Sequence, residues 1–316
     1  MMVVSAGAAS KDFTDKDEIK HSEAVEVMVA LNVISGKNDG SYFDPNGTLT
    51  REEMAKVISF VMNGGVEPVV GTKVTPTYSD IKGIWSEKYI EYCTSMGIIN
   101  GDGAGKFNPT GTLTAEQAAK MFLTAMGYNA NVFGFTGNSW AINVGRYANE
   151  AGLYKNLGDV VPSQPISRDD ACQMAYNAIQ ATMMKRTWTQ DLQTGELTES
   201  YQPWVENGVS HTLLGEKFDG AIQVGFLTGY NYDSNKKTWT YSFAANTAFG
   251  TTITVTNPIT VGSLKSSVDY TGLFGQQVKV IYDTTTNDVV YGIYANESKI
   301  LAEGYTGNLP SSIAAA

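Results

Sequence analysis

Two arginines stand at the predicted start of a helix, where their side chains could bind a carboxylate. Arg51 follows Thr50 and Arg168 follows Ser167, and an acidic residue comes three positions after each Ser or Thr. This pattern is typical of a capping box, so each arginine should be the first residue of its helix, although the helix dipole disfavours a cation there. Free backbone N–H groups and a guanidinium fork together can hold a carboxylate, with about 1.5 to 3 kcal/mol from each charge-assisted hydrogen bond. The alternative is a solvated arginine that pairs with a nearby Asp or Glu.

The helices that position these arginines belong to an internal repeat. The same four-residue phrase occurs three times, as Thr50-Arg51-Glu52-Glu53, Thr114-Ala115-Glu116-Gln117 and Ser167-Arg168-Asp169-Asp170. Apolar residues follow each copy with the i, i+3, i+4, i+7 spacing of one buried helical face, at 54–61, 118–125 and 171–178. The second copy has alanine where the other two have arginine.

The repeat extends upstream of each phrase. Leu31–Gly36 matches Met96–Gly101, and Phe43–Gly47 matches Phe107–Gly111. Each unit therefore consists of a helix, a glycine stop, a Pro/Gly loop and a capped helix. The amphipathic run of the first unit is matched in the second by a run that carries Trp85, Tyr89, Ile90 and Cys93. The third unit is shorter and more divergent, with Trp140 in the place of Trp85.

The repeated unit resembles the S-layer homology (SLH) module of bacterial surface proteins. The resemblance rests on motifs that recur in one order, namely Phe13-Thr14-Asp15 and Tyr78-Ser79-Asp80 at the unit starts, the helix end at Gly97 to Gly101, Asp39-Gly40 and Asp102-Gly103, the Phe-x-Pro loops and the Thr-Arg-Glu-Glu phrase. It covers residues 11 to about 184. The resemblance implies three modules, at residues 11–65, 76–130 and 131–185, packed around a pseudo-threefold axis.

The resemblance also implies a ligand and a set of binding residues. SLH modules hold surface proteins to an acidic, commonly pyruvylated, secondary cell-wall polysaccharide that is linked to peptidoglycan, and they bind it in grooves between modules. Carried over to this sequence, the glycan-binding residues are Arg51, Arg168, Thr50, Ser167, Trp85, Trp140, Asp39 and Gly40. The chain departs from the family pattern at Ala115, and at Lys20 where the other units have tryptophan. The sequence therefore does not establish a third equivalent binding groove.

Composition and charge narrow the class of protein. The chain of 316 residues has a formal net charge of -10 and 42% hydrophobic residues, which argues against disorder and, without a basic patch, against nucleic-acid binding. Residues 1–10 resemble the remnant of a signal peptide, the alternative being an apolar start to a cytosolic chain. No other stretch approaches the roughly 20 apolar residues that span a membrane. We expect a secreted protein at the bacterial cell wall, where an acidic chain must bind an acidic polymer through local cationic sites.

The chain changes character after residue 185, where helical periodicity ends. Short alternating runs rich in Thr, Tyr and Val lie between turn clusters, at 222–230, 238–243, 251–255, 278–282 and 289–294. Asp233–Lys236 and Thr285–Asp288 are the expected hairpin loops. We interpret residues 186–215 as a linker or arm and residues 216–316 as an antiparallel β domain. The predicted fold class is therefore α plus β, in several domains.

Residues for other chemistries are sparse. Cys93 and Cys172 lie in apolar company and are predicted to be buried thiols, with a cross-module disulfide as the alternative. Residues 42–53 resemble a calcium-binding EF-hand loop, but Tyr42 falls where the first carboxylate ligand is expected. The two histidines fall in no nucleophile, metal or phosphate-loop pattern. We therefore expect no metal, no cofactor and no catalysis.

Two functions fit these features. In the first, the protein is a structural component of a surface layer, in which the modules bind wall glycan and the β domain makes assembly contacts in an array or fibre. In the second, it is a wall-anchored, carbohydrate-binding adhesin whose β domain recognises an external ligand. The alternating aromatic residues from Tyr230 to Phe243 could serve as a sugar-facing surface, a self-associating surface or a half-buried core.

Overall fold

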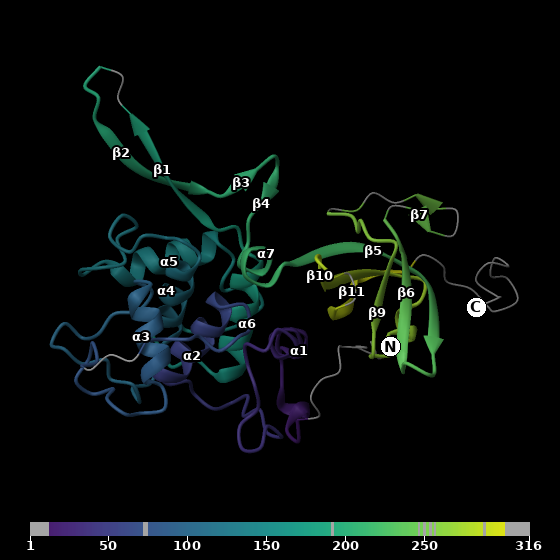
Figure 1. Ribbon diagram of the computed structural model, residues 1–316, viewed down its shortest axis with the longest axis horizontal. Coiled ribbons are helices and arrows are strands. Elements are labelled where there is room, and N and C mark those ends of the chain that lie inside the picture. Colours follow the sequence, from purple (N-terminus) through teal and green to yellow (C-terminus); the bar gives the residue numbers. More distant parts are fainter. Residues whose placement is uncertain are drawn as a thin grey trace, which may run out of the picture. The chain divides into compact units, whose positions relative to one another are not determined.

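The chain folds into two compact units, which divide after Phe218. A computed structural model describes residues 13–71, 75–190, 193–245, 247–248, 251–252, 255, 257–286 and 289–300 (Figure 1). The predicted signal-peptide remnant, residues 1–10, lies outside the described residues. The helical unit spans Phe13–Phe218, and the sheet of the second unit begins at Gly220. The α plus β fold class is confirmed.

The helical unit contains three pairs of helices among its described residues. They are α1 and α2 (Ser22–Ala30, Arg51–Met62), α3 and α4 (Glu87–Ser95, Ala115–Ala125), and α5 and α6 (Trp140–Glu150, Arg168–Gln180), with a short 3-10 helix η1 (Lys16–Glu18) at the start. The second helix of each pair begins as predicted, because the hydroxyls of Thr50, Thr114 and Ser167 each accept a hydrogen bond from the backbone N–H three residues on.

The three pairs are linked in a closed cycle. The first helix of each pair packs on the second helix of another, α3 on α2, α5 on α4 and α1 on α6. At the centre, the N–H of Leu113 donates to the carbonyl of Leu49 at 3.0 Å, Ile166 to Leu113 at 3.0 Å, and Leu49 to Ile166 at 3.3 Å. These three residues are buried, so the cycle surrounds an apolar centre.

The aspartates of the recurring start motifs fix the Phe-x-Pro loops. The carboxylate of Asp15 accepts from the N–H of Phe43 at 2.9 Å and of the following residue at 2.7 Å. Asp80 accepts in the same way from Phe107 and its successor, both at 2.8 Å. Burial acts to raise the pKa of Asp80, but these N–H donors outweigh it and hold the pKa below its ordinary value. The two phenylalanine rings are thereby held in place beside the arginines described below.

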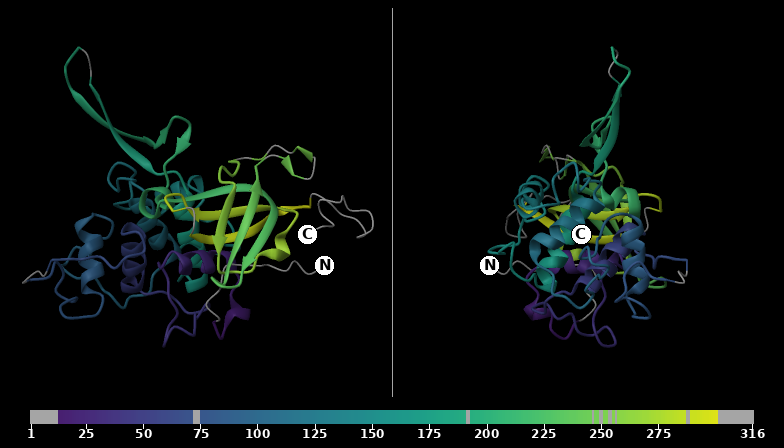
Figure 2. Two further views of the ribbon diagram at one scale, coloured as in Figure 1. Left: turned by 45° about the vertical axis from the view of Figure 1, so that its right-hand side comes forward. Right: turned by 90° about the vertical axis from the view of Figure 1, so that its left-hand side faces the viewer.

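The predicted linker or arm, residues 186–215, forms two β hairpins among its described residues and belongs to the helical unit. It forms a long antiparallel hairpin of β1 and β2 (Met184–Gln190, Leu197–Pro203) and a short one of β3 and β4 (Val205–Glu206, Val209–Ser210). The long hairpin stands away from the helices in both views of Figure 2, and at its base Tyr201 packs edge-on against Phe133 at 5.7 Å. Sequence reasoning missed these strands because both are largely exposed and many of their residues are polar.

A short helix, α7 (Leu213–Phe218), follows the hairpins and also belongs to the helical unit. Its Leu213, Leu214 and Phe218 are buried, and the helix packs on α6 and α2. The predicted start of the β domain at residue 216 therefore falls inside α7. Because Phe218 is buried with α7, the boundary between the two units lies after Phe218 and not before residue 216.

The second unit is an antiparallel sheet in the order β11-β10-β5-β6-β9. Its strands are β5 (Gly220–Asp233), β6 (Thr238–Ala244), β9 (Ser263–Ser266), β10 (Gln276–Asp283) and β11 (Val290–Ile300), with a 3-10 helix η2 (Thr271–Leu273) before β10. The predicted loop at Asp233–Lys236 joins β5 to β6, as expected. Within the predicted strand at 251–255, the described residues include β8 (Thr251–Thr252), which pairs with β7 (Thr247–Ala248).

Candidate functional site

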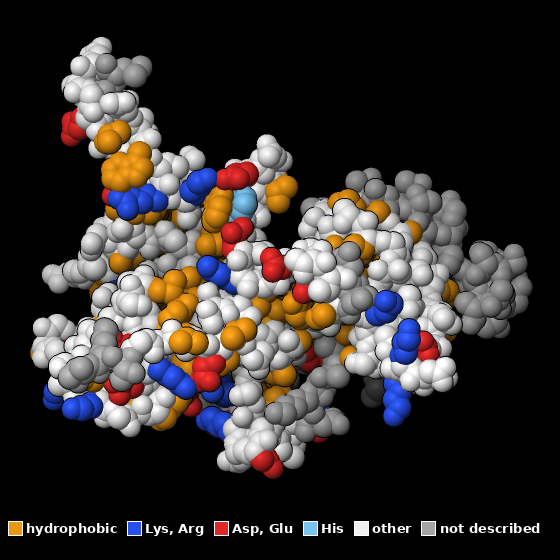
Figure 3. Space-filling model, viewed as in Figure 1, with side chains coloured by type: hydrophobic (Ala, Val, Ile, Leu, Met, Phe, Trp, Pro, Cys, Tyr) orange, Lys and Arg blue, Asp and Glu red, His pale blue; other side chains and the backbone are white. Residues whose placement is uncertain are grey.

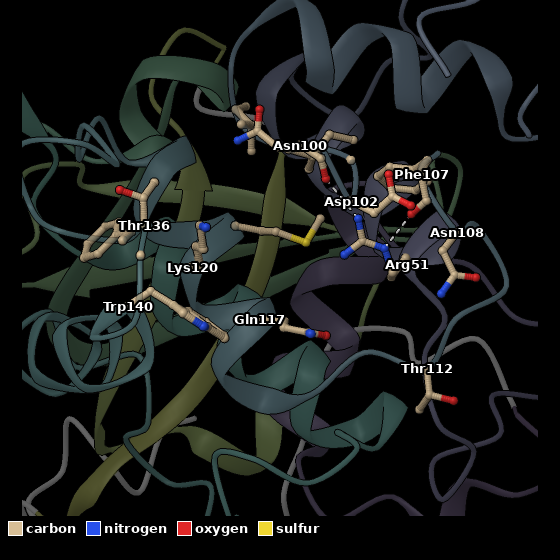
Figure 4. Close-up of a pocket in the computed structure, with 16 residues that line it drawn as sticks. Arg51, Asn100, Asp102, Phe107, Asn108, Thr112, Gln117, Lys120, Thr136 and Trp140 are labelled. Atoms are coloured by element: carbon tan, nitrogen blue, oxygen red, sulfur yellow. Dashed lines mark hydrogen bonds between the residues drawn. The ribbon is translucent and has the colours of Figure 1, made fainter. Parts of the chain in front are cut away.

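A cavity of about 700 Å³ lies where residues of all three helix pairs meet (Figure 4). Arg51 comes from the start of α2, Lys120 from α4 and Trp140 from the start of α5, while residues 98–102 form the loop after α3. The full lining is Arg51, Ile98, Ile99, Asn100, Gly101, Asp102, Phe107, Asn108, Thr112, Gln117, Lys120, Met121, Phe135, Thr136, Gly137 and Trp140. Residues far apart in the sequence thus share one hollow, with two cations and one carboxylate in its wall.

Arg51 is held in this cavity by backbone carbonyls. Its Nε donates to the carbonyl of Phe107 at 2.9 Å and its Nη2 to that of Asn100 at 3.0 Å, and the guanidinium carbon lies 4.4 Å from the centre of the Phe107 ring. In the described part of the chain no carboxylate forms an ion pair with Arg51. Burial lowers the pKa of this side chain, but an arginine remains protonated at neutral pH. Arg51 therefore has no direct ion-pair partner there, while the charges of Asp80 and Asp102 favour its protonated form.

Lys120 supplies the second positive charge of the cavity. Its pKa is lowered, first by burial and then by the charge of Arg51. Its ammonium lies 5.5 Å from the centre of the Trp140 ring, and among the described residues it has no ion-pair partner. Figure 4 shows Arg51 and Lys120 on different walls of the same space, with Trp140 beside the lysine. Two cations brought together in this way stabilise a bound anion and repel each other without one.

A second, smaller cavity of about 170 Å³ repeats this arrangement around Arg168. The Nη2 of Arg168 donates to the carbonyl of Ser35 at 2.6 Å, and its guanidinium carbon lies 5.1 Å from the centre of the Phe43 ring. Lys56 of α2 and Trp85, just before α3, complete the set. The full lining is Val33, Ile34, Ser35, Gly36, Lys37, Glu53, Lys56, Val57, Trp85 and Arg168. The Nε of Arg168 is buried and has no hydrogen-bond partner in the described residues.

Comparison with known proteins assigns the repeat. The sequence model of the S-layer homology domain family matches residues 12–55 and 77–119. The chain therefore contains two segments that match the S-layer homology domain. It is 28% identical over 181 residues to the S-layer protein EA1 of Bacillus anthracis and, over the same length, 28% identical to an S-layer protein of Bacillus licheniformis. In both cases 54% of this chain and 20% of the relative are aligned, so the chain spans about a fifth of each relative's length.

The chain is also similar to proteins with other names. An uncharacterized cell wall amidase of Bacillus anthracis is 26% identical over 213 residues, which cover 64% of this chain and 38% of the amidase. The third pair of helices, α5 and α6, lies outside the two segments that match the family. Trp140 and Arg168, which belong to that pair, nevertheless line the two cavities.

The predicted role of the backbone N–H groups at the helix starts is wrong. The N–H of Arg51 donates to the carbonyl of Gly111 at 2.9 Å, and that of the next residue to Pro109 at 2.9 Å. The N–H of Arg168 likewise donates to the carbonyl of Gly47 at 2.7 Å. The Pro/Gly loop of a neighbouring helix pair therefore uses the groups that we expected to be free. These N–H groups at the helix starts are therefore not available to an anion in the cavities.

The remaining predicted residues take different places. Thr50 and Ser167 cap their helices and do not line either cavity, so they orient the arginines indirectly. Trp85, a predicted glycan-binding residue, is 53% exposed and lines the Arg168 cavity. Asp39 and Gly40 form a turn in which Asp39 accepts from the N–H of Ser41 at 3.2 Å, and neither lines that cavity.

Lys56 and Lys120 are the functional candidates that sequence reasoning missed. Each stands five residues after the first residue of its capped helix, so the repeat itself places them at equivalent positions. They escaped notice because the pattern was searched for apolar residues, whereas these lysines lie at the edge of the buried face. Comparing polar positions between the copies would have identified both.

Other kinds of site find little support in the described residues. Cys93 and Cys172 are buried free thiols, as predicted, and burial raises the pKa of Cys93 to about 12. In the same part of the chain no group of three His, Cys, Asp or Glu side chains could hold a metal ion. None of the described helices is both long and apolar enough to cross a membrane.

Proposed function

We propose that this chain is a non-catalytic component of a bacterial cell surface, held to the wall by SLH modules that bind acidic, pyruvylated secondary cell-wall polysaccharide. The observation that carries the proposal is the grouping of Arg51 with Lys120 in one cavity and of Arg168 with Lys37 and Lys56 in the other. Neither arginine forms an ion pair with a carboxylate among the described residues. Such cavities suit a sugar that carries a carboxylate, because charge-assisted hydrogen bonds need a desolvated cation and a fixed donor.

The geometry of Arg51 leaves donors for such a ligand. A guanidinium has five N–H donors, and the carbonyls of Phe107 and Asn100 accept from two of its nitrogens. At least two further N–H groups therefore remain for the two oxygens of a carboxylate. The stacked Phe107 ring fixes the plane of the fork, and Trp140 offers an aromatic face for the sugar ring beside it. We assign Arg51, Lys120 and Trp140 to one glycan site, and Arg168, Lys56 and Trp85 to the other.

The overall charge of the chain does not favour an acidic polymer, so binding must be local. The net charge is -10, and on the face shown in Figure 3 basic and acidic side chains are interspersed without a continuous basic surface. Attraction to the glycan should therefore depend on short-range contacts inside the cavities and should fall only moderately with salt.

The proposal includes three SLH modules, at residues 11–65, 76–130 and 131–185, around a pseudo-threefold axis. The closed cycle of hydrogen bonds among Leu49, Leu113 and Ile166 supports this arrangement, since an open row of modules would leave one of these links unmade. The recurrence of the helix starts supports it as well. In this arrangement each glycan site combines residues from all three modules.

A mutant with both arginines removed tests the glycan proposal. Wild type should be retained on purified pyruvylated wall glycan, and Arg51→Ala combined with Arg168→Ala should lose most retention. Arg146→Ala is the matched control, because Arg146 is 60% exposed on α5 and pairs with Glu150 outside both cavities. Undiminished retention of the double variant would refute the site assignment.

The β unit is assigned to assembly contacts with other copies of the chain. Tyr230 and Tyr232 are 38% and 46% exposed and flank Trp239, so an aromatic surface continues outward from the buried Tyr241. Full-length protein should then sediment as oligomers, whereas residues 13–218 should remain monomeric. Identical sedimentation of the two would remove this role and favour the adhesin alternative.

A further inference from the structure

A third interface of the helical unit corresponds to the two cavities but has lost their chemistry. It lies between the start of α4 and residues of the third helix pair, where Ala115 occupies the arginine position. The position of the stacking phenylalanine, two residues before the loop proline, holds Val160, and the lysine position holds Gln173. The tryptophan position, twelve residues before the left-handed residue that ends the first helix, holds Lys20. All four side chains of the set have thus been replaced together.

The carbonyl that the arginine binds elsewhere is satisfied from within the third helix pair. Asn100 and Ser35, whose carbonyls accept from Arg51 and Arg168, correspond to Lys155. The Nδ2 of Asn177 donates to the carbonyl of Lys155 at 2.7 Å and also to that of Leu153 at 3.0 Å. The neutral amide of Asn177 on α6 therefore satisfies the carbonyl that an arginine binds in the other two interfaces, but it carries no charge.

Residues next to Asn177 also close the third interface. The Nε2 of Gln173 donates to the Oδ1 of Asn177 at 2.8 Å, so both amides are committed to internal hydrogen bonds. Ala115 is fully buried and Gln173 is 6% exposed. Solvent does not reach the point from which an arginine would extend, and the only cation at the four positions, Lys20, is exposed. Apart from the exposed Lys20, these positions offer a carboxylate no positive charge.

We propose that this interface is closed to ligands and is stabilised by Asn177, so that the chain has two glycan sites and not three. The inference rests on the proposed glycan binding, which it makes more specific by fixing the number of ligands. It also assigns Asn177 a role in stability that no copy of the repeat shares, because the equivalent positions hold Phe60 and Thr124.

Stability measurements test the closure without any ligand. Asn177→Ala removes two hydrogen bonds to backbone carbonyls, and at about 1 kcal/mol each the melting temperature of the full chain should fall by about 4 to 8 °C. Thr124→Ala, at the equivalent position of α4, is the matched control and should lower it by no more than about 2 °C. Equal effects of the two variants would overturn the role of Asn177.

Calorimetric titration tests the number of sites. With a methyl N-acetylhexosaminide that carries a 4,6-pyruvate ketal as the probe, wild type should bind two equivalents, Arg51→Ala and Arg168→Ala one each, and the double variant none. Three equivalents on wild type, or one equivalent left on the double variant, would overturn the closed interface. If wild type binds no probe, the glycan proposal fails, while the melting temperatures still decide whether Asn177 closes the interface.

Discussion

Lys120 should contribute strongly to glycan binding while reducing the stability of the fold. Lys120→Met removes the charge and keeps the aliphatic stem. A carboxylate at about 4 Å from the ammonium gains about 4 kcal/mol at an effective dielectric constant of about 20. Solvent reaches part of this half-buried side chain, so we expect about half of that energy, or roughly a 30-fold rise in Kd.

The stability of the same variant should change in the opposite direction. Because burial and the charge of Arg51 lower the pKa of Lys120, the folded protein holds the protonated lysine at a cost. This cost is present below the lowered pKa and disappears as the pH rises past the ordinary value of 10.5. Lys120→Met should therefore melt higher than wild type at pH 7, with the difference vanishing above about pH 10.5.

Binding is best measured by calorimetry in an Arg168→Ala background, where only the Arg51 cavity remains. Gln173→Met is the matched control, since position 173 is equivalent but lies in the closed interface, and it should leave Kd unchanged. A change of less than twofold in Kd on Lys120→Met, with the cavity otherwise intact, would refute the idea that the lysine faces the ligand.

Three further changes have defined outcomes. Asp80→Asn should destabilise the protein at pH 7 by about 1 kcal/mol for each weakened backbone hydrogen bond. Because the pKa of Asp80 is depressed in the folded protein, the difference in stability from wild type should shrink as the pH falls below about 4. A difference that stays constant in acid would contradict this. Cys93 should not react with iodoacetamide at pH 8 unless urea is added, since its pKa is about 12 and the side chain is fully buried; labelling of native protein would show that the site opens. Trp140→Ala should raise Kd for the Arg51 cavity about fivefold, through the loss of about 1 kcal/mol of aromatic contact. An unchanged Kd, measured by calorimetry in the Arg168→Ala background, would contradict this role.

The parts of the fold that depend on neighbouring residues could be predicted from the sequence. The starts of α2, α4 and α6 are encoded by hydrogen bonds between residues three apart, so Thr50, Thr114 and Ser167 identify them. The β hairpin around Asp233–Lys236 follows from alternation and turn residues in the same way. The hairpin of β1 and β2 could not be found, because strands exposed on both faces carry no apolar alternation.

The parts of the site that depend on packing between helix pairs could not be predicted. The repeat pointed to Arg51 and Arg168, but not to the carbonyls of Gly111 and Gly47, which occupy the N–H groups of these residues. Those contacts join segments about 60 and 120 residues apart. The exposure of Trp85 could not be predicted either. Helical periodicity assigns a buried or exposed face only to residues within a helix, and Trp85 precedes α3.

The most direct test of the account is to titrate the full chain with one wall glycan before and after mild acid has removed its pyruvate ketals. If cationic cavities around Arg51 and Arg168 bind the carboxylate, the pyruvylated glycan should bind and the treated glycan should lose most of its affinity, by about 100-fold or more for two charge-assisted hydrogen bonds at each site. Equal affinity for both forms would contradict the central claim that the wall is recognised through its acidic groups.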